Sequence, residues 1–418
     1  MSISNKLSIE DLDLKDKRVL IRVDFNVPLH KEDGHITNSQ RIEAALPTLK
    51  YALEKGAKTI ILMSHLGRPD GRRNPKESLA VVAPKLQELI GRPVTFLDDC
   101  IGEAVEKAVS GGTGGQIFLL ENLRFHAEEE GSGKDQDGKT FKPSAEEVKK
   151  FRESLTRLGD VFVNDAFGTA HRAHSSMVGV ALQRGSGFLM KKELEFFGKV
   201  LENPTKPRLA ILGGAKVSDK IKIIFNLLDK IDRLIIGGGM SFTFEKVLHN
   251  TQIGKSLFDQ EGSKIVNEIV NKAKEKGVEL FLPVDWVAAE KFDKNAQHKV
   301  VARKDGVPEG WMGLDIGPET RKIFNEVVLS SKTILWNGPM GVFEFPAFAQ
   351  GTKDVMDALV EVTKTGATTV IGGGDSAACA AENGIEDKVG HVSTGGGASM
   401  ELLEGRDLPG VTALTDKK

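Results

Sequence analysis

In the second half of the chain, short apolar runs alternate with glycine-rich turns that carry a polar or charged residue. Five such run-and-turn segments lie at residues 211–216, 235–239, 335–339, 370–375 and 392–397. A buried parallel strand typically reads as a short continuous apolar run, and ligands of open α/β sheets bind beyond the strands' carboxyl ends. Glycine lets backbone N–H groups approach an anion, and a following helix adds its positive N-terminus. Five such turns on one sheet edge indicate a nucleotide or phosphate site.

The first half of the chain also alternates strand-like and helical segments. Apolar runs predict buried strands at residues 18–28, 59–63, 116–120 and 160–164. Between the first two, apolar residues recur at helical spacing, at Ile42, Leu46, Leu49 and Leu53. Pro47 lies inside this stretch, so we expect it either to kink the helix or to mark its true start.

This repetition predicts an α/β fold with two doubly wound parallel-sheet (Rossmann-like) domains joined by a hinge helix. A length of 418 residues also favours two domains over one. The connecting helix is expected at residues 190–203, where apolar residues from Met190 to Leu201 share one face and Pro204 follows. The first domain would then span residues 1–189 and the second residues 204–403.

Composition and charge narrow the class of protein. A net charge of −2 argues against nucleic acid or an anionic membrane as the partner. The two cysteines, Cys100 and Cys379, form neither a disulfide framework nor a metal-ligand pattern. No apolar run approaches about 18 residues, and the first residues alternate polar with apolar, so neither a spanning helix nor a signal peptide is expected. We therefore expect a cytoplasmic protein.

Arginines gather where the predicted strands of the first half end. Arg22, Arg68, Arg124 and Arg172 follow or close such strands, and Arg41 opens the helix after the first one. If the sheet is parallel, these ends converge, and clustered guanidinium groups repel one another unless an anion lies among them. For any single arginine, pairing with a surface carboxylate is an equally good interpretation. The five together favour an anion site.

Histidines accompany these arginines, at positions 65, 171 and 174. The spacing of His171 and His174 allows metal ligation, but no acidic or cysteine partner completes such a site, so we do not favour it.

In the second half, Lys216 follows two glycines at a predicted strand end, where its ammonium group can reach a bound phosphate. The alternative is a lysine whose charge simply extends to solvent. Asp375 opens a helix after three glycines, so it can cap that helix or hold Mg²⁺ beside a polyphosphate. Glu344 is positioned to accept hydrogen bonds from a ribose hydroxyl.

Three common enzyme motifs do not explain these turns. The chain has neither the phosphate-binding G-x-x-x-x-G-K-[ST] motif nor the hydrolase G-x-S-x-G motif. Gly372, Gly374 and Ala377 match the loose dinucleotide fingerprint, but the next strand end carries no acidic residue for a ribose hydroxyl.

Six segments resemble the phosphoglycerate kinase family, in the order that this family shows. They are RVDFNVP at 22–28, SHLGRP at 64–69, NDAFGTAHRAHSS at 164–176, GGAKVSDK at 213–220, GGGDSA at 372–377 and STGGGAS at 393–399. The resemblance covers essentially the whole chain. Two departures are mild and remove no charge: Met340 lies between Pro339 and Gly341, and Ser376 stands where many relatives have threonine.

The resemblance implies phosphoryl transfer between 1,3-bisphosphoglycerate and MgADP, giving 3-phosphoglycerate and MgATP. It implies that the first domain binds the triose, that residues 404–418 return to that domain, and that hinge bending brings the substrates together. The implied substrate-binding residues are Arg22, Val23, Asp24, Phe25, Asn26, Arg41, Ser64, His65, Gly67, Arg68, Leu123, Arg124, His171 and Arg172.

The second domain would bind ADP or ATP with Mg²⁺ held by Asp375. The implied nucleotide-binding residues are Gly213, Gly214, Ala215, Lys216, Lys220, Gly238, Gly239, Gly313, Gly338, Met340, Phe343, Glu344, Gly374, Asp375 and Ser376. Arg41, Lys216, Gly395 and Gly396 are the expected catalytic residues, because transfer needs charge neutralisation rather than a nucleophilic side chain. We expect a monomer. The rival interpretation is a non-catalytic nucleotide and anion sensor, which the intact Lys216, Arg41 and Asp375 disfavour.

Overall fold

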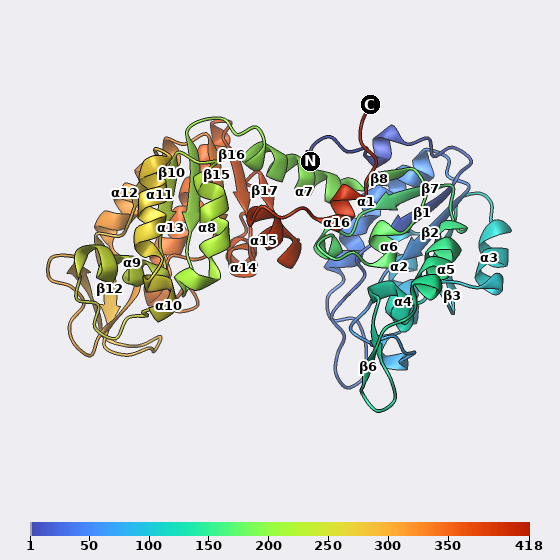
Figure 1. Ribbon diagram of the computed structural model, residues 1–418, viewed down its shortest axis with the longest axis horizontal. Coiled ribbons are helices and arrows are strands. Elements are labelled where there is room, and N and C mark those ends of the chain that lie inside the picture. The colour runs from blue at the N-terminus through green and yellow to red at the C-terminus, as the bar shows by residue number, and fades with distance from the viewer. Residues whose placement is uncertain (1) are drawn as a thin grey trace. The chain divides into compact units, whose positions relative to one another are not determined.

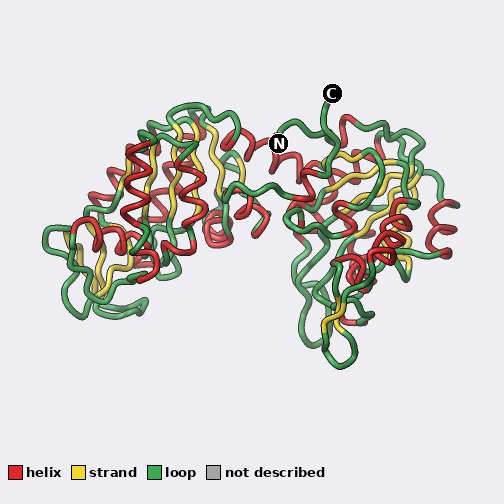
Figure 2. The backbone as a smooth tube through the Cα atoms, in the orientation of Figure 1, coloured by secondary structure: helices red, strands yellow, loops and turns green. Residues whose placement is uncertain are grey.

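The computed structural model describes residues 2–418 and divides by its internal contacts into two compact units (Figures 1 and 2). Unit 1 comprises residues 2–194 together with Asp407–Lys418, and unit 2 comprises Glu195–Arg406. Among residues 2–418, no helix has both the length and the apolar character needed to cross a membrane.

Unit 1 is built on a parallel sheet whose order reverses at its centre. Across the sheet the strands are β3 (Val94–Leu97), β4 (Gln116–Leu120), β2 (Thr59–Met63), β1 (Arg18–Arg22), β7 (Val161–Asn164) and β8 (Arg184–Ser186). Strand β1 pairs in parallel with both β2 and β7. Its residues alternate between the two faces, so Val19 and Ile21 contact one helical layer and Leu20 the other.

Helices cover both faces of this sheet. On one side lie α1 (Gln40–Glu54) and α2 (Val82–Ile90), and on the other α3 (Glu103–Ser110) and α5 (Ala145–Thr156). The shorter elements are α4 (Ala127–Glu130), α6 (Ser175–Val178), α16 (Pro409–Thr412) and the antiparallel pair β5 (Gly133–Lys134) and β6 (Thr140–Phe141). The last residues of the chain pack here, since Lys6 forms an ion pair with Asp416 at 2.7 Å.

Unit 2 repeats this plan. Its parallel sheet has the order β11 (Glu279–Phe281), β10 (Arg233–Ile236), β9 (Arg208–Leu212), β15 (Thr333–Asn337), β16 (Thr368–Ile371) and β17 (His391–Val392). Strand β9 pairs with both β10 and β15, so the order again reverses at the centre. The prediction of two parallel α/β domains is confirmed.

Helices also flank the second sheet, and a small sheet extends unit 2. The helices are α8 (Ile221–Leu228), α9 (Met240–His249), α10 (Gln260–Ser263), α11 (Val266–Glu275), α12 (Pro318–Leu329), α13 (Gln350–Lys364), α14 (Gly374–Glu382) and α15 (Gly397–Leu403). The apolar faces of α12 and α13 pack on Leu209 and Ile211 of β9. An antiparallel sheet of β13 (His298–Ala302), β12 (Asp285–Ala289) and β14 (Met312–Ile316) was not predicted from the sequence.

Helix α7 (Phe188–Leu201) occupies the stretch expected to connect the domains, and the division between the units falls inside it, after Leu194. Its start is fixed to unit 1 by Asp165, whose carboxylate accepts hydrogen bonds from the backbone N–H groups of Leu189 at 3.0 Å and Met190 at 3.3 Å. Thr48 donates to the same carboxylate at 2.8 Å.

Several boundaries differ from the expectations. Strand β1 ends at Arg22, so residues 23–28 form a loop instead of extending the strand. Helix α1 begins at Gln40 and contains Pro47, which therefore does not mark its start. Asp375 lies in the first turn of α14, whose N-cap position is occupied by Gly373.

Candidate functional site

The reversal of strand order in each sheet identifies where a ligand would bind. In an open parallel sheet, the connections on either side of the reversal leave in opposite directions and open a crevice at the carboxyl ends of the strands. In unit 1 this place lies beyond β1 and β7, and in unit 2 beyond β9 and β15. The predicted functional residues follow these strand ends.

Beyond the sheet of unit 1 lies a polar hollow of about 590 Å³, here named the cationic pocket. Its predicted members are Asn26, His65, Gly67, Arg68, Arg124, His171 and Arg172. Residues from four separate strand ends therefore meet in one pocket. His174, noted above only as a possible metal ligand, also lines it, together with the unpredicted members Asp70, Glu130, Ser132, Gly133, Lys134, Thr140, Gly168 and Thr169.

The arginine at the end of β4 is held in place by neighbours in the cationic pocket. Arg124 donates to the carbonyl oxygen of Gly67 at 3.0 Å and lies 3.6 Å from a carboxylate oxygen of Glu130. Gly67 in turn donates its N–H to Asn26 Oδ1 at 2.9 Å. Arg68 and Arg172 are exposed at the pocket, so their guanidinium groups are accessible to a bound anion.

Two imidazoles of the cationic pocket are held in the neutral form. Burial, together with the nearby positive charges of Arg22 and Arg124, holds the pKa of His65 well below its ordinary value. Burial and the charges of Arg124, Arg22 and Arg172 lower the pKa of His174 to about 3. Positive charge that suppresses imidazole protonation in this way marks a site suited to an anion.

Arg22, which was expected near the bound triose, lies behind the pocket and does not line it. Its side chain is fully buried and donates to Ser176 Oγ at 2.9 Å and to the carbonyl oxygen of Val23 at 2.6 Å. Its third contact, at 3.0 Å, is to Nδ1 of His65. Arg22 therefore orients His65 and adds positive charge beneath the pocket.

Three other expected residues turn their side chains into the core. Val23, Phe25 and Leu123 are 0% exposed and belong to the apolar clusters on the two faces of the sheet. Their backbone N–H groups are also already bonded, to Met63 and Ser64, so these three residues support the site from within the core. Sequence reasoning could not distinguish these buried positions from their neighbours, because all of them follow strand ends.

Arg41, Asp24 and Ser64 lie beside the cationic pocket without lining it. Arg41 donates to the carbonyl oxygen of Asn26 at 2.7 Å and lies 3.4 Å from Asp24 Oδ1. Half of its side chain is exposed, so its remaining donors face solvent. Ser64 accepts from the N–H of Phe25 at 2.9 Å and thus fixes the loop after β1.

Beyond the sheet of unit 2 lies a second hollow of about 350 Å³, here named the glycine pocket. Nine predicted residues line it: Gly214, Ala215, Gly238, Gly239, Gly313, Met340, Phe343, Glu344 and Asp375. The five predicted glycine turns follow β9, β10, β15, β16 and β17 of the same parallel sheet. The pocket therefore opens beside several turns at once.

Glycine is required where the turns pack backbone against backbone. A Cβ atom on Gly213 would lie 2.0 Å from the carbonyl oxygen of Pro339. Gly338 has φ = +104°, and a Cβ atom there would lie 2.3 Å from the carbonyl oxygen of Gly213. These two glycines do not line the pocket, but they bring the turns after β9 and β15 close together.

The lysines after β9 have different environments. Lys216 is exposed and directly follows Ala215, which lines the glycine pocket. Lys220 is largely buried and donates to Asn337 Oδ1; burial lowers its pKa, while Asp219 and Asp375 act in the opposite direction.

The turn after β16 holds two further predicted residues, Gly374 and Ser376, beside the glycine pocket without lining it. Ser376 accepts a hydrogen bond from the N–H of Gly338 at 2.7 Å and ties this turn to the one after β15. A Cβ atom on Gly374 would meet open space, so its backbone is accessible. Asp375 lines the pocket with an exposed carboxylate.

An apolar wall of the glycine pocket was missed by sequence reasoning. It consists of Phe242, Leu257, Trp286, Phe292, Leu314 and Val342. Phe292 and Leu257 are 61% and 56% exposed, which is high for large apolar residues in a soluble protein. Much of this wall comes from the unpredicted antiparallel sheet and its connections, so no strand-end motif signalled it.

The last glycine turn, after β17, presents a bend that only glycine adopts readily. Gly396 has φ = +51° and precedes α15, while the N–H of Gly395 bonds to Ser393 Oγ at 3.2 Å. Gly396 is exposed and Gly395 is buried, so the two glycines differ in access to a ligand.

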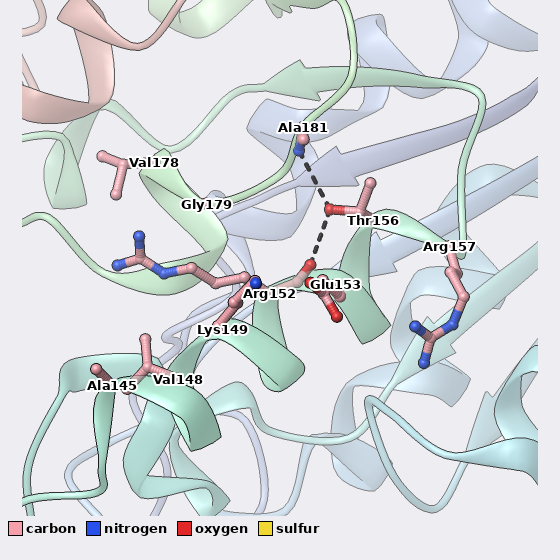
Figure 3. Close-up of a pocket in the computed structure, with 10 residues that line it drawn as sticks. All are labelled: Ala145, Val148, Lys149, Arg152, Glu153, Thr156, Arg157, Val178, Gly179 and Ala181. Carbon is pink, nitrogen blue, oxygen red and sulfur yellow. Dashed lines mark hydrogen bonds between the residues drawn. The ribbon is translucent and has the colours of Figure 1, made fainter.

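A further hollow of about 640 Å³ lies away from all of these residues (Figure 3). It is formed by α5 and the segment after α6, with Lys149, Arg152 and Val178 at its edge. Thr156 accepts from the N–H of Ala181 at 3.1 Å and donates to the carbonyl oxygen of Arg152 at 2.8 Å. No predicted functional residue lines this hollow.

The family model, the related sequences and the solved structures that match this chain all belong to the same protein family. The family model of phosphoglycerate kinase matches residues 9–406. Phosphoglycerate kinases of Funneliformis mosseae and Candida maltosa are 62% and 63% identical to this chain, with 100% of both chains covered in each case. The solved structure of phosphoglycerate kinase from Coxiella burnetii has a TM-score of 0.86 and 38% identity, covering 98% of both chains. That from Pyrococcus horikoshii OT3 has a TM-score of 0.74 and 31% identity at the same coverage.

Proposed function

The chain belongs to the phosphoglycerate kinase family, and from this premise we propose how its two pockets divide the reaction. The protein is a phosphotransferase of glycolysis that transfers a phosphoryl group reversibly between 1,3-bisphosphoglycerate and ADP, giving 3-phosphoglycerate and ATP. The comparisons do not favour the sensor alternative.

The cationic pocket binds the triose in this proposal. The observation that carries it is that Arg68, Arg124 and Arg172, from three separate strand ends, line one pocket together with His65 and His174. Guanidinium groups match phosphate oxygens in pairs, and the neutral imidazoles add donors without adding repulsion. Glu130 also lines the pocket, and its contact with Arg124 holds that guanidinium in position before a ligand arrives.

Replacing Arg68 or Arg172 by alanine is expected to weaken binding of 3-phosphoglycerate and to leave ADP affinity nearly unchanged. Each lost charge-assisted hydrogen bond is worth about 1.5–3 kcal/mol, which corresponds to a tenfold or greater rise in Kd. Calorimetric titration of each substrate measures both affinities. Arg72→Ala is the matched control, because Arg72 is exposed and lies outside the pocket lining. Equal weakening of ADP would contradict the division between the pockets.

Binding of 3-phosphoglycerate is also expected to draw protons onto the protein. A bound phosphate opposes the arginine charges, so it raises the pKa of His174 from about 3 towards the ordinary imidazole value of about 6.5. A pKa raised on binding means proton uptake when the pH lies between the free and bound values. Titration heats at pH 5.5 in two buffers of different ionisation enthalpy give the number of protons bound. His174→Asn should reduce that number, and an unchanged number would exclude His174 as the acceptor.

The glycine pocket binds the nucleotide in this proposal. Its apolar wall suits a nucleobase, and the accessible backbone at Gly214 in the pocket and at Gly374 next to Asp375 suits phosphate groups. Glu344 lines the same pocket and is placed to accept hydrogen bonds from a ribose hydroxyl. Lys220 bonds to Asn337, and Ser376 bonds to Gly338, so these two side chains hold the adjoining turns together.

Asp375 fits the role of holding Mg²⁺ with the nucleotide. Mg²⁺ is usually bound through one or two carboxylates together with substrate phosphate oxygens and water. Asp375 offers an exposed carboxylate at the pocket, next to backbone that phosphate can approach. When bound, the ion neutralises negative charge on the phosphates.

Transfer itself rests on charge neutralisation by Lys216, Arg41 and the backbone at Gly395 and Gly396. The transferring phosphoryl group spreads negative charge over its oxygens, and no covalent intermediate with a side chain is required. Lys216 and Arg41 are exposed cationic side chains at the two strand-end sites, and Gly396 presents an accessible backbone. A coupled assay of ATP-dependent phosphorylation of 3-phosphoglycerate tests the whole proposal. Nucleotide binding without turnover would favour the sensor.

We also propose that the protein acts as a cytoplasmic monomer without nucleic-acid or membrane partners. The net charge of −2 supports the absence of nucleic-acid and membrane partners, and the two free, buried cysteines support a reducing compartment. Light scattering after size exclusion measures the mass in solution.

A further inference from the structure

We propose that the hairpin at residues 28–37 of unit 1 binds a zinc ion through His30, Asp33 and His35. This site is separate from the cationic pocket and from Asp375. The donor atoms of the three side chains lie within 4.8 Å of one another. All three side chains are exposed, so an ion can reach them directly from solvent.

The backbone of the hairpin brings the two histidines together. Leu29 and Ile36 form an antiparallel bridge, and the N–H of His30 donates to the carbonyl oxygen of His35 at 2.8 Å. Gly34 closes the turn with φ = +73° and donates to the carbonyl oxygen of His30 at 2.9 Å. The two imidazole rings stack with centroids 4.8 Å apart and planes inclined by 16°.

Both imidazoles direct the same ring nitrogen at one carboxylate oxygen. Nδ1 of His30 lies 3.4 Å from Asp33 Oδ1, and Nδ1 of His35 forms a hydrogen bond with that same oxygen. The N–H of His35 also donates to Asp33 Oδ1, at 3.1 Å, so the carboxylate is fixed between the rings.

The spacing of His30 and Asp33 suits a shared cation. The backbone N–H of Glu32 lies 3.3 Å from Nδ1 of His30, which is long for a hydrogen bond, so zinc displaces only a weak donor from this nitrogen. Nδ1 of His30 and Oδ1 of Asp33 lie 3.4 Å apart, about the separation of two ligand atoms on one tetrahedral zinc ion.

Two imidazole nitrogens and one carboxylate oxygen form a donor set that zinc prefers, and solvent completes the coordination. On binding, zinc takes the lone pair of His35 Nδ1, and the single ring proton moves to Nε2 by exchange with solvent, so the imidazole stays neutral. The ion then links both arms of the hairpin, which leads through residue 39 into α1 and Arg41.

A second cluster of possible ligands suits zinc less well. Asp99, Cys100 and His126 also bring donor atoms within 4.8 Å. Cys100 is fully buried, and burial raises the pKa of its thiol well above the ordinary value, so the thiolate ligand is disfavoured.

Calorimetric titration of the tag-free, nucleotide-free full chain with zinc chloride tests the proposal. We expect one zinc ion per chain, bound through the hairpin. Loss of a residue that only supports a metal ligand typically lowers metal affinity by about 10–100-fold. His30 and His35 are proposed as direct ligands, so His30→Ala and His35→Ala should each lower zinc affinity by roughly tenfold or more. His249→Ala is the matched control, since His249 is exposed at the end of α9 and outside both clusters.

Nitrogen-15 spectra of the histidine rings provide a readout at the atoms themselves. Zinc should shift Nδ1 of His30 and His35 and leave the ring nitrogens of His249 unchanged. The proposal is overturned by wild-type affinity in both His30→Ala and His35→Ala, or by loss of binding in His126→Ala alone. It is equally overturned if no binding is seen up to about 1 mM zinc, which corresponds to a binding free energy weaker than about −4 kcal/mol.

Discussion

Replacing Lys216 by alanine is expected to lower kcat by about 10²–10³-fold while changing the KM for nucleotide little. Lys216 stands at the end of β9, exposed and directly after the residues that line the glycine pocket. An ammonium group in this place is expected to stabilise the transition state more than the bound substrates, because negative charge develops on the phosphoryl group during transfer. Steady-state kinetics with nucleotide varied at saturating 3-phosphoglycerate separate the two parameters.

The matched control for this variant is Lys222→Ala. Lys222 is exposed in α8, six positions further along the chain, and does not line the glycine pocket. Its loss should leave both kinetic parameters unchanged. If Lys216→Ala keeps a near-normal kcat and only raises the nucleotide KM, Lys216 binds the ground state and is not a catalytic residue.

Replacing Arg22 by methionine is expected to destabilise unit 1 by about 3–5 kcal/mol, because it leaves a buried carboxylate without its positive partner. Both Arg22 and Glu129 have 0% exposed side chains, and their charged groups lie 3.9 Å apart. Glu129 also accepts from the N–H and the hydroxyl of Ser176, at 2.7 and 2.6 Å. Hydrogen exchange of the β1 amides measures the stability of unit 1 alone.

Two comparisons test the cause of this loss. The double variant Arg22→Met with Glu129→Gln should be less destabilised than Arg22→Met, because no unpaired charge remains in the core. Arg73→Ala removes the exposed ion pair with Asp98 and should cost less than about 1 kcal/mol. If Arg22→Met costs no more than Arg73→Ala, the buried pair does not support the fold.

The contrast between Arg22 and Arg124 shows what a strand-end position does not reveal. Both arginines are found at or just after a strand end, and the sequence predicts the same role for them. Arg22 is enclosed by its contacts with Ser176 and Glu129. Arg124 instead lines the cationic pocket, where it donates a hydrogen bond to the carbonyl oxygen of Gly67. These partners lie far away in the chain, so local spacing carries no information about them.

The apolar wall of the glycine pocket was likewise not predictable from local sequence. Phe292 and Trp286 belong to stretches without a glycine turn or a charged motif, and the sheet that places them was not predicted. Met340 was expected among the nucleotide-binding residues only from the family resemblance; it lines the pocket while its side chain is buried against Gly237. An apolar residue carries no local signal of which surface it will form.

The sequence by itself determined the strand-and-turn framework and the chemistry at its edge. Strand periodicity and the backbone freedom of glycine act over a few residues, so the turns after β9, β10, β15, β16 and β17 were predictable from their own segments. Only the tertiary structure decided which side chains face a ligand and which support them from behind. That choice depends on partners distant in the chain, whose packing excludes water from Arg22 and leaves Arg68 and Lys216 exposed.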